Sequence, residues 1–400
     1  MGTPTKTVLV INCGSSSVKF AIIDPVTGES FISGLAEALN LPDARISYRF
    51  GSGKKTEVSL GANATHYDAI QFITDTVLKG QEDLLHSIIA VGHRIVQGGD
   101  LYSEPTLVDD SVEAGIEKCI PFAPLHNPAH LQGIRAARKI FKNVPHVTVF
   151  DTAFHQTMPD YAYRYAIPES LYTEHKIRKY GAHGTSHKYV AEVAAKWLKK
   201  DIADTNVITC HLGNGASVTA VKGGKCVDTS MGLTPLDGLV MGTRCGSLDP
   251  SVVFFMGKLG YSFDDCEKIL NKQSGLLALY GKTSDWRGVT EGVEQGDEKA
   301  ILAYKMFTYR LARFIASYYV PLQRVDALVF TGGIGENSKV MRTEVLKNLA
   351  FLGYRINEEM NDKARLGGEG VISMPDTPPV FVIPTNEELA IARAAAKFAK

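Results

Sequence analysis

The fold is decided near the N-terminus by a stretch that reads Val8-Leu9-Val10-Ile11-Asn12-Cys13-Gly14-Ser15-Ser16-Ser17-Val18-Lys19. Its four leading residues are an apolar run typical of a buried strand. A turn of small residues follows, and the chain then stays extended, unlike a Walker A loop or a GxGxxG turn, after which a helix begins. A tight hairpin of this type can surround phosphate oxygens with N–H groups and hydroxyls. A serine-rich β-turn with no ligand would also explain the stretch.

Half a chain later the same arrangement returns. Residues 207–210 are a second apolar run, a small-residue turn spans 211–216, and residues 217–221 are extended again. A further pair of apolar runs, 88–91 and 327–330, each ends in a glycine turn. Strand, turn and strand, repeated at an offset of about half the protein, indicate an internal duplication. The sequence therefore predicts two mixed α/β halves, each opening with a hairpin of phosphate size.

The length of the chain also points to two domains. Its 400 residues are too many for one ordinary core, so domains of roughly 150–200 residues are expected. We predict a first domain from residues 1–150 together with 384–400, and a second from residues 151–383. The C-terminal helix would then return to the first domain.

Two helices have recognisable start signals. Thr185 or Ser186 can cap a helix over residues 187–199, which carries one apolar stripe. Thr385 and Glu388 have the spacing of a capping box ahead of an alanine-rich C-terminal helix.

The composition argues against several classes of function. The 43 basic residues balance 43 acidic ones, which argues against broad nucleic-acid binding, because that needs a basic face to displace counterions. No apolar run approaches the roughly 20 residues that span a bilayer, and no apolar signal segment opens the chain. The six cysteines show no CxxC pair, so they are expected to be reduced thiols. We therefore expect a cytoplasmic protein with no nucleic-acid and no membrane partner.

Several segments could contact an anion. Thr331-Gly332-Gly333-Ile334-Gly335-Glu336-Asn337 follows a buried-type strand, and its glycines let backbone approach a phosphate closely, although loop flexibility alone would explain them. Arg94 and Arg244 have glycines nearby, so each guanidinium could reach a planar anion bidentately, although most arginines are only solvated. Asp285-Trp286-Arg287 is more typical of a surface ion pair.

Acidic residues and histidines suggest where a metal could bind. Asp151 ends the run 147–150, and Glu387 starts the last predicted helix. Carboxylates beside a phosphate site usually hold Mg²⁺, which needs only one or two protein ligands, although charge complementarity at a helix N-terminus explains Glu387 equally well. His183 and His187 have i,i+4 spacing without the glutamate of an HExxH motif, so zinc is not expected. The glycines flanking His183 favour an accessible ring.

Together these segments resemble the acetate kinase family, the acetokinases. The resemblance is carried by residues 10–20, by Tyr180-Gly181-Ala182-His183-Gly184-Thr185-Ser186-His187, by Asp228-Thr229-Ser230-Met231-Gly232-Leu233-Thr234-Pro235, by residues 330–337, and by Pro384-Thr385-Asn386-Glu387-Glu388. The match spans essentially the whole chain in order. It implies an α/β fold, the duplicated actin-like ATPase (ribonuclease H-like) fold, with the nucleotide in a cleft between two domains. It also implies a homodimer built mainly through the second domain.

The resemblance assigns roles in binding metal and nucleotide. Asn12 and Glu387 would hold Mg²⁺, for which Mn²⁺ can substitute, and Lys19 would reach the phosphates. ATP or ADP would be lined by His211, Leu212, Gly213, Asn214, Gly215, Asp285, Trp286, Arg287, Gly332, Gly333, Ile334, Gly335 and Glu336. Trp286 is bulkier than the family pattern leads us to expect between its neighbours, which could alter nucleotide preference.

The resemblance also assigns the acid site. Arg94 would hold the substrate carboxylate, Asp151 would be the catalytic acid or base, and His183 with Arg244 would steady the transition state. The chain has Gln97 where the family usually carries histidine, which puts one detail of the acid site in question.

The implied reaction converts acetate and ATP into acetyl phosphate and ADP, reversibly and by direct in-line displacement. A carboxylic acid with a pKa of about 4–5 is already ionised at neutral pH, so positioning and electrostatics should dominate. We therefore favour Asp151 as an orienting and metal-shell group over an essential proton acceptor. Val96, Leu125 and Pro235 are expected to form a shallow apolar wall that favours acetate, with about 1–3 kcal/mol of discrimination per methylene.

Three other functions fit parts of the pattern. A propionate or other short-chain fatty acid kinase would share the fold and most motifs. An exopolyphosphatase-like hydrolase would need a positioned water and would gain nothing from paired arginines for a carboxylate. An actin-like filament or chaperone ATPase would share only the fold.

Overall fold

The computed structural model describes residues 6–399 and divides the chain into two compact units. Unit 1 comprises Met1–Phe154 and Asn386–Lys400, and unit 2 comprises His155–Thr385. The sequence prediction placed these divisions at residues 150 and 384. Asp151, which that prediction assigned to the second domain, lies in unit 1, where its carboxylate is paired with Arg94.

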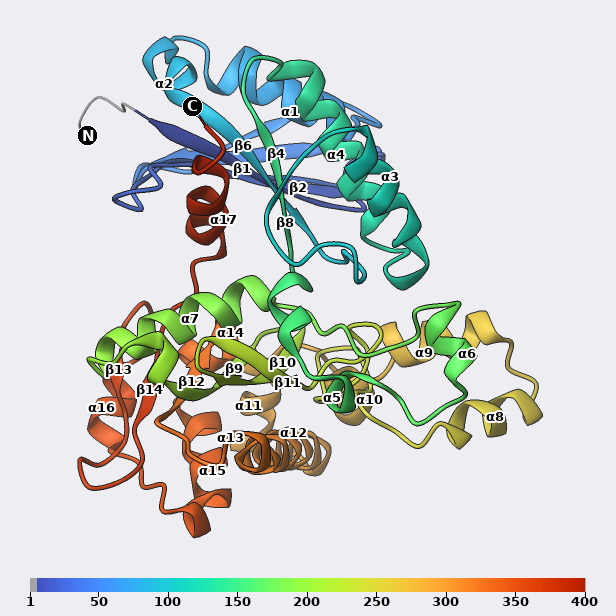
Figure 1. Cartoon of the computed structure of the whole chain (residues 1–400), viewed down its shortest axis with the longest axis vertical. Helices are drawn as coiled ribbons and strands as arrows, with labels where there is room; N and C mark the ends of the chain where they lie inside the picture. The colour runs from blue at the N-terminus through green and yellow to red at the C-terminus, as the bar shows by residue number, and fades with distance from the viewer. Residues whose placement is uncertain (1–5, 400) are drawn as a thin grey trace. The chain divides into compact units, whose positions relative to one another are not determined.

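Unit 1 is built on an eight-stranded sheet with the order β5-β4-β3-β2-β1-β6-β8-β7 (Figure 1). Its strands are β1 (Thr7–Gly14), β2 (Ser17–Ile23), β3 (Ser30–Glu37), β4 (Arg45–Phe50), β5 (Thr56–Ser59), β6 (Ile88–Ile95), β7 (Thr106–Leu107) and β8 (His146–Phe150). Strands β1 to β5 are joined as antiparallel neighbours, whereas β1, β6 and β8 run parallel. The predicted hairpin is therefore β1–β2.

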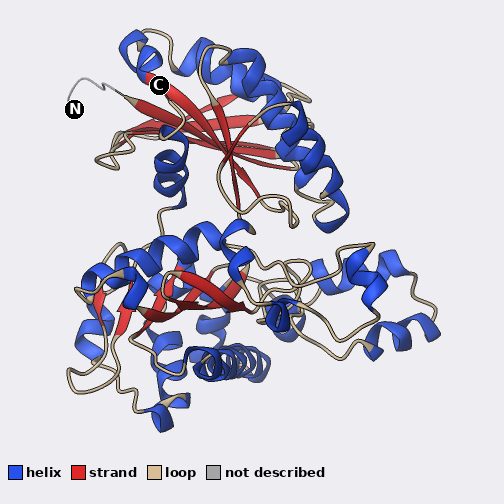
Figure 2. Cartoon of the chain, in the orientation of Figure 1, coloured by secondary structure: helices blue, strands red, loops and turns tan. Residues whose placement is uncertain are grey.

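Helices cover both faces of this sheet (Figure 2). They are α1 (His66–Phe72), α2 (Glu82–Ser87), α3 (Asp110–Lys118), α4 (Asn127–Ile140) and α17 (Glu387–Ala396). Because side chains alternate along a strand, Leu9 and Ile11 pack in a core with α1 and α4, whereas Val8 and Val10 pack against α17. The C-terminal helix thus belongs to unit 1, as predicted, and it brings Glu387 to the sheet.

Unit 2 repeats the central part of this topology. Its six-stranded sheet has the order β11-β10-β9-β12-β14-β13. Its strands are β9 (Asn206–Leu212), β10 (Ala216–Lys222), β11 (Lys225–Thr229), β12 (Ala327–Thr331), β13 (Gly370–Val371) and β14 (Val380–Val382). Strand β9 pairs antiparallel with β10 and parallel with β12, as β1 pairs with β2 and β6. The predicted duplication of an actin-like α/β unit is confirmed.

The sheet of unit 2 has α7 on one face and α12 with its neighbours on the other (Figure 1). The helices of unit 2 are α5 (Asp160–Tyr163), α6 (Glu169–Thr173), α7 (Gly184–Trp197), α8 (Ser251–Lys258), α9 (Phe263–Lys272), α10 (Gly275–Tyr280), α11 (Trp286–Glu294), α12 (Glu298–Ser317), α13 (Tyr319–Leu322), α14 (Gly332–Asn337), α15 (Lys339–Asn348) and α16 (Glu358–Lys363). No helix within residues 6–399 is both long enough and apolar enough to cross a bilayer.

Two predicted helix starts are wrong. Helix α7 begins at Gly184, and the residue before it, His183, has a left-handed φ of 58°. Ser186 is therefore inside the helix, where its hydroxyl contacts His211 and Thr385. Helix α17 is capped by the side chain of Asn386, not by the predicted box, because the Thr385 hydroxyl is bonded to Ser186 and Glu388 pairs with Lys19.

Candidate functional site

In unit 1, groups from four elements line one pocket. Asn12 on β1 lies opposite Lys19 on β2 in the register of the hairpin, and β6 carries Arg94 beside them. The first turn of α17 adds Glu387. The pocket is lined by Val10, Asn12, Lys19, Phe20, Arg94, Glu387, Glu388 and Ile391. The structure thus brings together the residues predicted for metal, phosphate and carboxylate binding in unit 1.

Arg94 is held by Asp151, which follows β8. Its Nε donates to Asp151 Oδ1 at 3.2 Å and its Nη2 donates to Oδ2 at 2.6 Å. The Asp151 side chain is only 1% exposed, whereas that of Arg94 is 21% exposed. Burial disfavours the charge of Arg94, but the carboxylates of Asp151 and Glu387 outweigh it and raise its pKa above the ordinary value. Arg94 is therefore a permanently charged, oriented guanidinium.

The residues predicted to hold magnesium fit a hard cation. Among the described residues, Glu387 Oε1 is buried and has no hydrogen-bond partner, which is costly unless another group satisfies it. Asn12, whose side chain carries an amide oxygen, lines the same pocket. Mg²⁺ keeps several waters and needs only one or two protein oxygens, so Asn12 and Glu387 form a suitable set.

The sequence analysis missed Glu388 as a member of this pocket. Its carboxylate lies 2.5 Å from the Nζ of Lys19, whose side chain is 58% exposed. This ion pair joins two of the residues that line the pocket. The adjacent Glu387 was the only available signal, because Glu388 itself looked like a helix-capping residue.

In unit 2, the side chains of Arg244 and His183 both approach the turn of the second hairpin. The turn is closed by a hydrogen bond from Gly213 N to Gly215 O at 3.0 Å, and Leu212 begins it at the end of β9. A side chain at Gly215 would place its Cβ 3.4 Å from Arg244 Nη1 and 3.5 Å from His183 Nε2. Glycine therefore lets these two groups converge on the hairpin.

His183 is oriented by its neighbours. Its Nδ1 lies 2.9 Å from the hydroxyl of Ser217, and its ring stacks on that of His211 with 4.2 Å between ring centroids. Its backbone is left-handed, with φ 58°, and α7 starts at the next residue. The predicted His183 and His211 thus belong to one cluster.

Arg244 lies in a loop beside the same hairpin. Its Nη1 donates to the carbonyl of Pro235 at 3.1 Å, and burial lowers its pKa from the ordinary value. The backbone N–H of Gly242 donates to the carbonyl of Asn214 at 3.0 Å, which ties this loop to the hairpin turn. The guanidinium is therefore positioned by backbone groups.

The glycine segment forms the short helix α14 rather than an open loop. Gly332 has φ +77°, and a Cβ there would lie 2.7 Å from the carbonyl oxygen of Leu212, so only glycine fits. Oε1 of Glu336 accepts from Gly332 N at 2.8 Å and from Thr385 N at 3.0 Å. Gly333, Ile334 and Gly335 complete the first turns of α14.

Asp285, Trp286 and Arg287 separate into two environments. Asp285 caps α11 and pairs with Arg287 at 2.6 Å, and Arg287 is 85% exposed. The indole of Trp286 is buried among Tyr304 and Phe307, and its Nε1 donates to Ser338 at 2.8 Å. Trp286 is therefore a core residue, and its large indole packs inside unit 2.

The predicted apolar wall is divided between the units. Val96 is buried just after β6, and Leu125 is 50% exposed, both in unit 1. Pro235 lies in unit 2. Gln97 is buried, and its Oε1 accepts from Gly99 N at 2.9 Å. The residue that departs from the family pattern therefore stabilises the local turn with its side chain.

Two copies of this sheet, each with its small-residue hairpin, define the duplicated actin-like ATPase fold. The crystal structure of a propionate kinase from Francisella tularensis subsp. tularensis SCHU S4 superposes with a TM-score of 0.93 at 46% identity, covering 98% of this chain and 100% of that one. That of Porphyromonas gingivalis acetate kinase superposes with a TM-score of 0.93 at 40% identity, covering 99% and 100%.

Sequence comparison agrees with the structures. Residues 7–393 match the profile of the Acetokinase family. The acetate kinase of Shewanella sp. (strain W3-18-1) is 56% identical over 393 residues, covering 98% of either chain. That of Shewanella loihica is 56% identical over 396 residues, covering 99% of either chain. The chain belongs to the acetokinase family, and is therefore a kinase with ATP and ADP as substrates.

Proposed function

We propose that this chain is an acetate kinase. It would transfer the γ-phosphoryl group of ATP to acetate by direct, reversible, Mg²⁺-dependent in-line displacement, giving acetyl phosphate and ADP. The observation that carries this proposal is the pocket in which an ion-paired Arg94 lies beside Asn12 and Glu387. Relatives at 56% identity that bear the name acetate kinase support it.

Arg94 is suited to bind the small acid. Asp151 uses two of the five N–H donors of Arg94, and within residues 6–399 no other acceptor is bonded to the remaining three, which can bind a carboxylate. Acetate is ionised at neutral pH and needs no proton removed, so a permanently charged guanidinium is the group the substrate requires. Because Asp151 is buried in this ion pair, we propose that it orients Arg94 and that it is not an essential proton acceptor.

Asn12 and Glu387 would hold Mg²⁺, with Mn²⁺ as a possible substitute. When bound, the ion would neutralise phosphate charge that otherwise repels the acid. Lys19, fixed by Glu388, would add a further positive charge for the nucleotide phosphates.

Unit 2 would supply the nucleotide and transition-state groups. Arg244 and His183 would stabilise the charge that develops on the transferred phosphoryl group, since both converge on Gly215. The nucleotide would contact the hairpin His211, Leu212, Gly213, Asn214 and Gly215, the pair Asp285 and Arg287, and the segment Gly332, Gly333, Ile334, Gly335 and Glu336. Trp286 would support this surface from the core.

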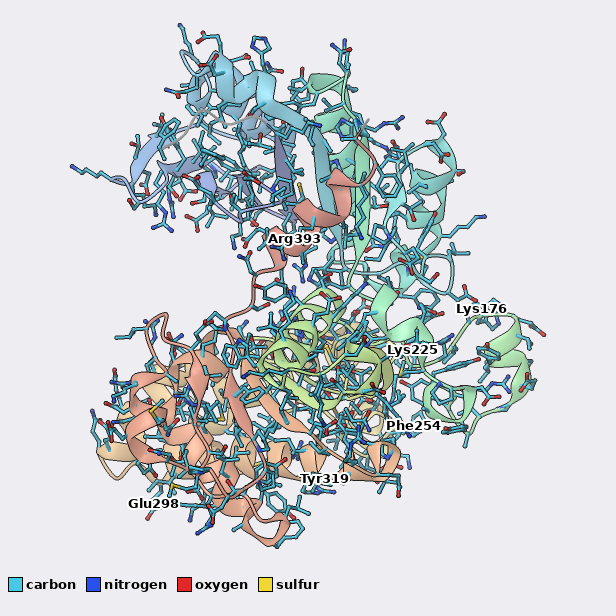
Figure 3. All side chains as sticks on the ribbon, turned by 60° about the vertical axis from the view of Figure 1, so that its left-hand side comes forward. Lys176, Lys225, Phe254, Glu298, Tyr319 and Arg393 are labelled. Carbon is cyan, nitrogen blue, oxygen red and sulfur yellow. The ribbon has the colours of Figure 1, made fainter. Side chains whose placement is uncertain are left out.

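We also propose a homodimer formed through unit 2 in the cytoplasm. Exposed apolar side chains gather on and after α8, where Phe254 projects from the helix (Figure 3). The patch consists of Val252, Phe254, Phe255, Leu259, Tyr261 and Phe263, which are 41–83% exposed. Large exposed apolar patches mark interaction sites, and a second copy is the partner that the family pattern suggests. The six free cysteines suit a reducing compartment.

A propionate kinase is the second candidate function. The observation that favours it is the close similarity to the Francisella propionate kinase, at 46% identity. The wall residues Val96, Leu125 and Pro235 would decide between the acids, because a methylene shifts discrimination by only about 1–3 kcal/mol.

One experiment tests both candidates. Hydroxylamine traps acyl phosphates, so the purified protein is incubated with ATP, Mg²⁺ and acetate, propionate or butyrate. We expect acetate to give the highest kcat/KM, propionate less, and Arg94→Gln to lose most activity on all three. A preference for propionate would select the second candidate, and no acyl phosphate from any acid would refute both.

A further inference from the structure

The carbonyl of Gly14, where the turn of the first hairpin begins, is bound by a histidine from another element. His66 Nε2 lies 2.7 Å from this oxygen. A carbonyl oxygen can only accept, so Nε2 carries the proton of this bond and the ring donates it. The imidazolium and the neutral ring protonated at Nε2 can both donate in this way, so the bond persists whether His66 is charged or neutral.

The helix that His66 begins holds its ring in place. His66 is the first residue of α1, and Thr65 caps that helix. Thr65 N donates to Asp68 Oδ2 at 2.8 Å and Asp68 N donates to Thr65 Oγ1 at 3.3 Å, which together form a capping box. His66 is only 3% exposed, and Ile70, one turn later, is fully buried. The imidazole is therefore a donor with a fixed position.

The position of α1 decides which way the peptide between Gly14 and Ser15 faces. Cys13 of β1 packs in the core with α1, whereas Asn12 lines the pocket with Glu387 of α17 on the opposite face of the sheet. Because the carbonyl of Gly14 is bonded to a residue of α1, it points toward the face that α1 covers. The peptide is trans and planar, so the N–H of Ser15 points the opposite way, toward the face that carries the pocket.

We propose that His66 is a positioning residue that keeps the Ser15 N–H turned toward the phosphates of the nucleotide. The inference rests on the proposed function, in which Mg²⁺ and the nucleotide phosphates lie beside Asn12. Ser15 is exposed, so its N–H can reach a ligand, and backbone N–H groups of tight turns bind anions. A second anchor supports the same turn, because Leu39 N donates to Ser16 O at 3.0 Å.

Two amide substitutions of different length test the donor. The NH₂ group of glutamine can take the place of histidine Nε2, whereas that of asparagine reaches only as far as Nδ1. His66→Asn should lower kcat/KM for ATP about tenfold, mainly through KM, whereas His66→Gln should recover to within about twofold of wild type. The KM for acetate should stay within about twofold in both, because Arg94 is untouched. Equal losses in the two variants, or normal ATP kinetics in His66→Asn, would overturn the proposal.

A double-mutant cycle tests whether His66 acts through the Ser15 N–H. Ser15→Pro deletes this N–H, and proline suits the position because Ser15 has a negative φ. Relative to Ser15→Ala, which lacks the hydroxyl but keeps the N–H, Ser15→Pro should lower kcat/KM for ATP about tenfold. In the proline background, His66→Asn should cost no more than about a further twofold, because the donor that it positions is already absent. A further tenfold loss would show an independent effect and refute the positioning role.

His146→Asn is the matched control for general destabilisation. His146 is also buried in unit 1, and its Nε2 donates to the carbonyl of Phe141 at 3.0 Å. It begins β8, whereas Gly14 ends β1, so the two lie toward opposite ends of the parallel strands. His146→Asn should lower the free energy of unfolding and leave the KM for ATP unchanged. An equal rise of that KM in His146→Asn and His66→Asn would indicate a merely structural role and overturn the proposal.

Amide spectra separate this inference from the proposed function. In ¹H–¹⁵N correlation spectra of the full chain, the Ser15 cross-peak should move when pyrophosphate and Mg²⁺ are added. It should move in wild type and in His66→Gln, and much less in His66→Asn. No movement in wild type, or an identical response in His66→Asn, would overturn the inference. If wild-type protein made no acyl phosphate, the proposed function would fail, whereas these spectra would still decide whether His66 orients the Ser15 N–H.

Discussion

Asp151→Asn tests whether the buried carboxylate orients Arg94 or removes a proton. The substitution keeps the shape of the side chain but removes its charge. The two hydrogen bonds to Arg94, of 3.2 and 2.6 Å, cannot both survive, because the amide NH₂ of asparagine cannot accept. Two unit charges about 4 Å apart attract by roughly 4 kcal/mol at an effective dielectric of 20. Glu387 still faces Arg94, so we expect a net loss of about 2–3 kcal/mol.

The loss should appear as a fall of about 30- to 150-fold in kcat/KM for acetate, at about 1.4 kcal/mol for each factor of ten. The assay is the hydroxylamine trap, measured over acetate and Mg²⁺ concentrations between pH 6 and 9. If Asp151 orients Arg94, the pH profile keeps its shape, because the substrate is already ionised. Near-normal turnover with unchanged Mg²⁺ dependence would refute the orienting role, and the loss of one limb of the pH profile would show a proton-transferring role.

Asp326→Asn is the matched control. Asp326 is another buried carboxylate, 7% exposed, paired with Lys200 at 2.7 Å. It precedes β12, whereas Gly332 follows that strand at its other end. The control should therefore lower the free energy of unfolding while leaving kcat/KM unchanged.

Three other perturbations have calculable outcomes. Burial lowers the pKa of His155 from 6.5 to about 4, so between these pH values the unfolded chain binds more protons than the folded chain, and stability is lost as the pH falls. In urea titrations at several pH values, His155→Gln should remove about 3 kcal/mol of this pH-dependent loss of unfolding free energy. Arg342→Met should cost about 3–5 kcal/mol by thermal unfolding, because the fully buried guanidinium donates to carbonyls that include those of Gly335 and Glu336, whereas the exposed Lys339→Met should cost little. Val96→Ala should raise the ratio of kcat/KM for propionate over acetate by about tenfold, and an unchanged ratio would remove Val96 from the acid pocket.

Much of the topology could be predicted because short stretches of sequence identify the central strands. Apolar runs ahead of small-residue segments identified β1, β9 and β12. The run 88–91 also identified a strand, but the glycine turn predicted after it is wrong, because β6 continues through Gly92 to Ile95. These four strands define the duplicated unit. Helix starts were less predictable, because a capping hydroxyl can find a better partner elsewhere. The Thr385 hydroxyl bonds to Ser186, 199 residues away, and no local spacing could reveal this.

The candidate site also contains residues that the sequence could predict and residues that it could not. Asn12, Arg94 and Glu387 could be grouped in advance through the family resemblance, and the structure places all three around one pocket. Trp286 could not be placed, because its burial depends on aromatic residues of α12 that only the folded core brings to it. Ser217 was also missed, since a serine in a strand looks ordinary until two histidines are seen beside its hydroxyl.

The duplication explains how one backbone plan can carry two kinds of chemistry. When the apolar runs of β1 and β9 are aligned, Asn12 and His211 occupy equivalent places at the end of the strand. In the first copy Asn12 lines a pocket with Glu387, whose Oε1 has no hydrogen-bond partner among the described residues, and such a pair suits a hard cation. In the second copy the ring packs on His183, beside serine and threonine hydroxyls that orient donors. We therefore propose that the same strand end serves a metal in one unit and hydrogen-bond donors for phosphate oxygens in the other, and that a few side chains decide which.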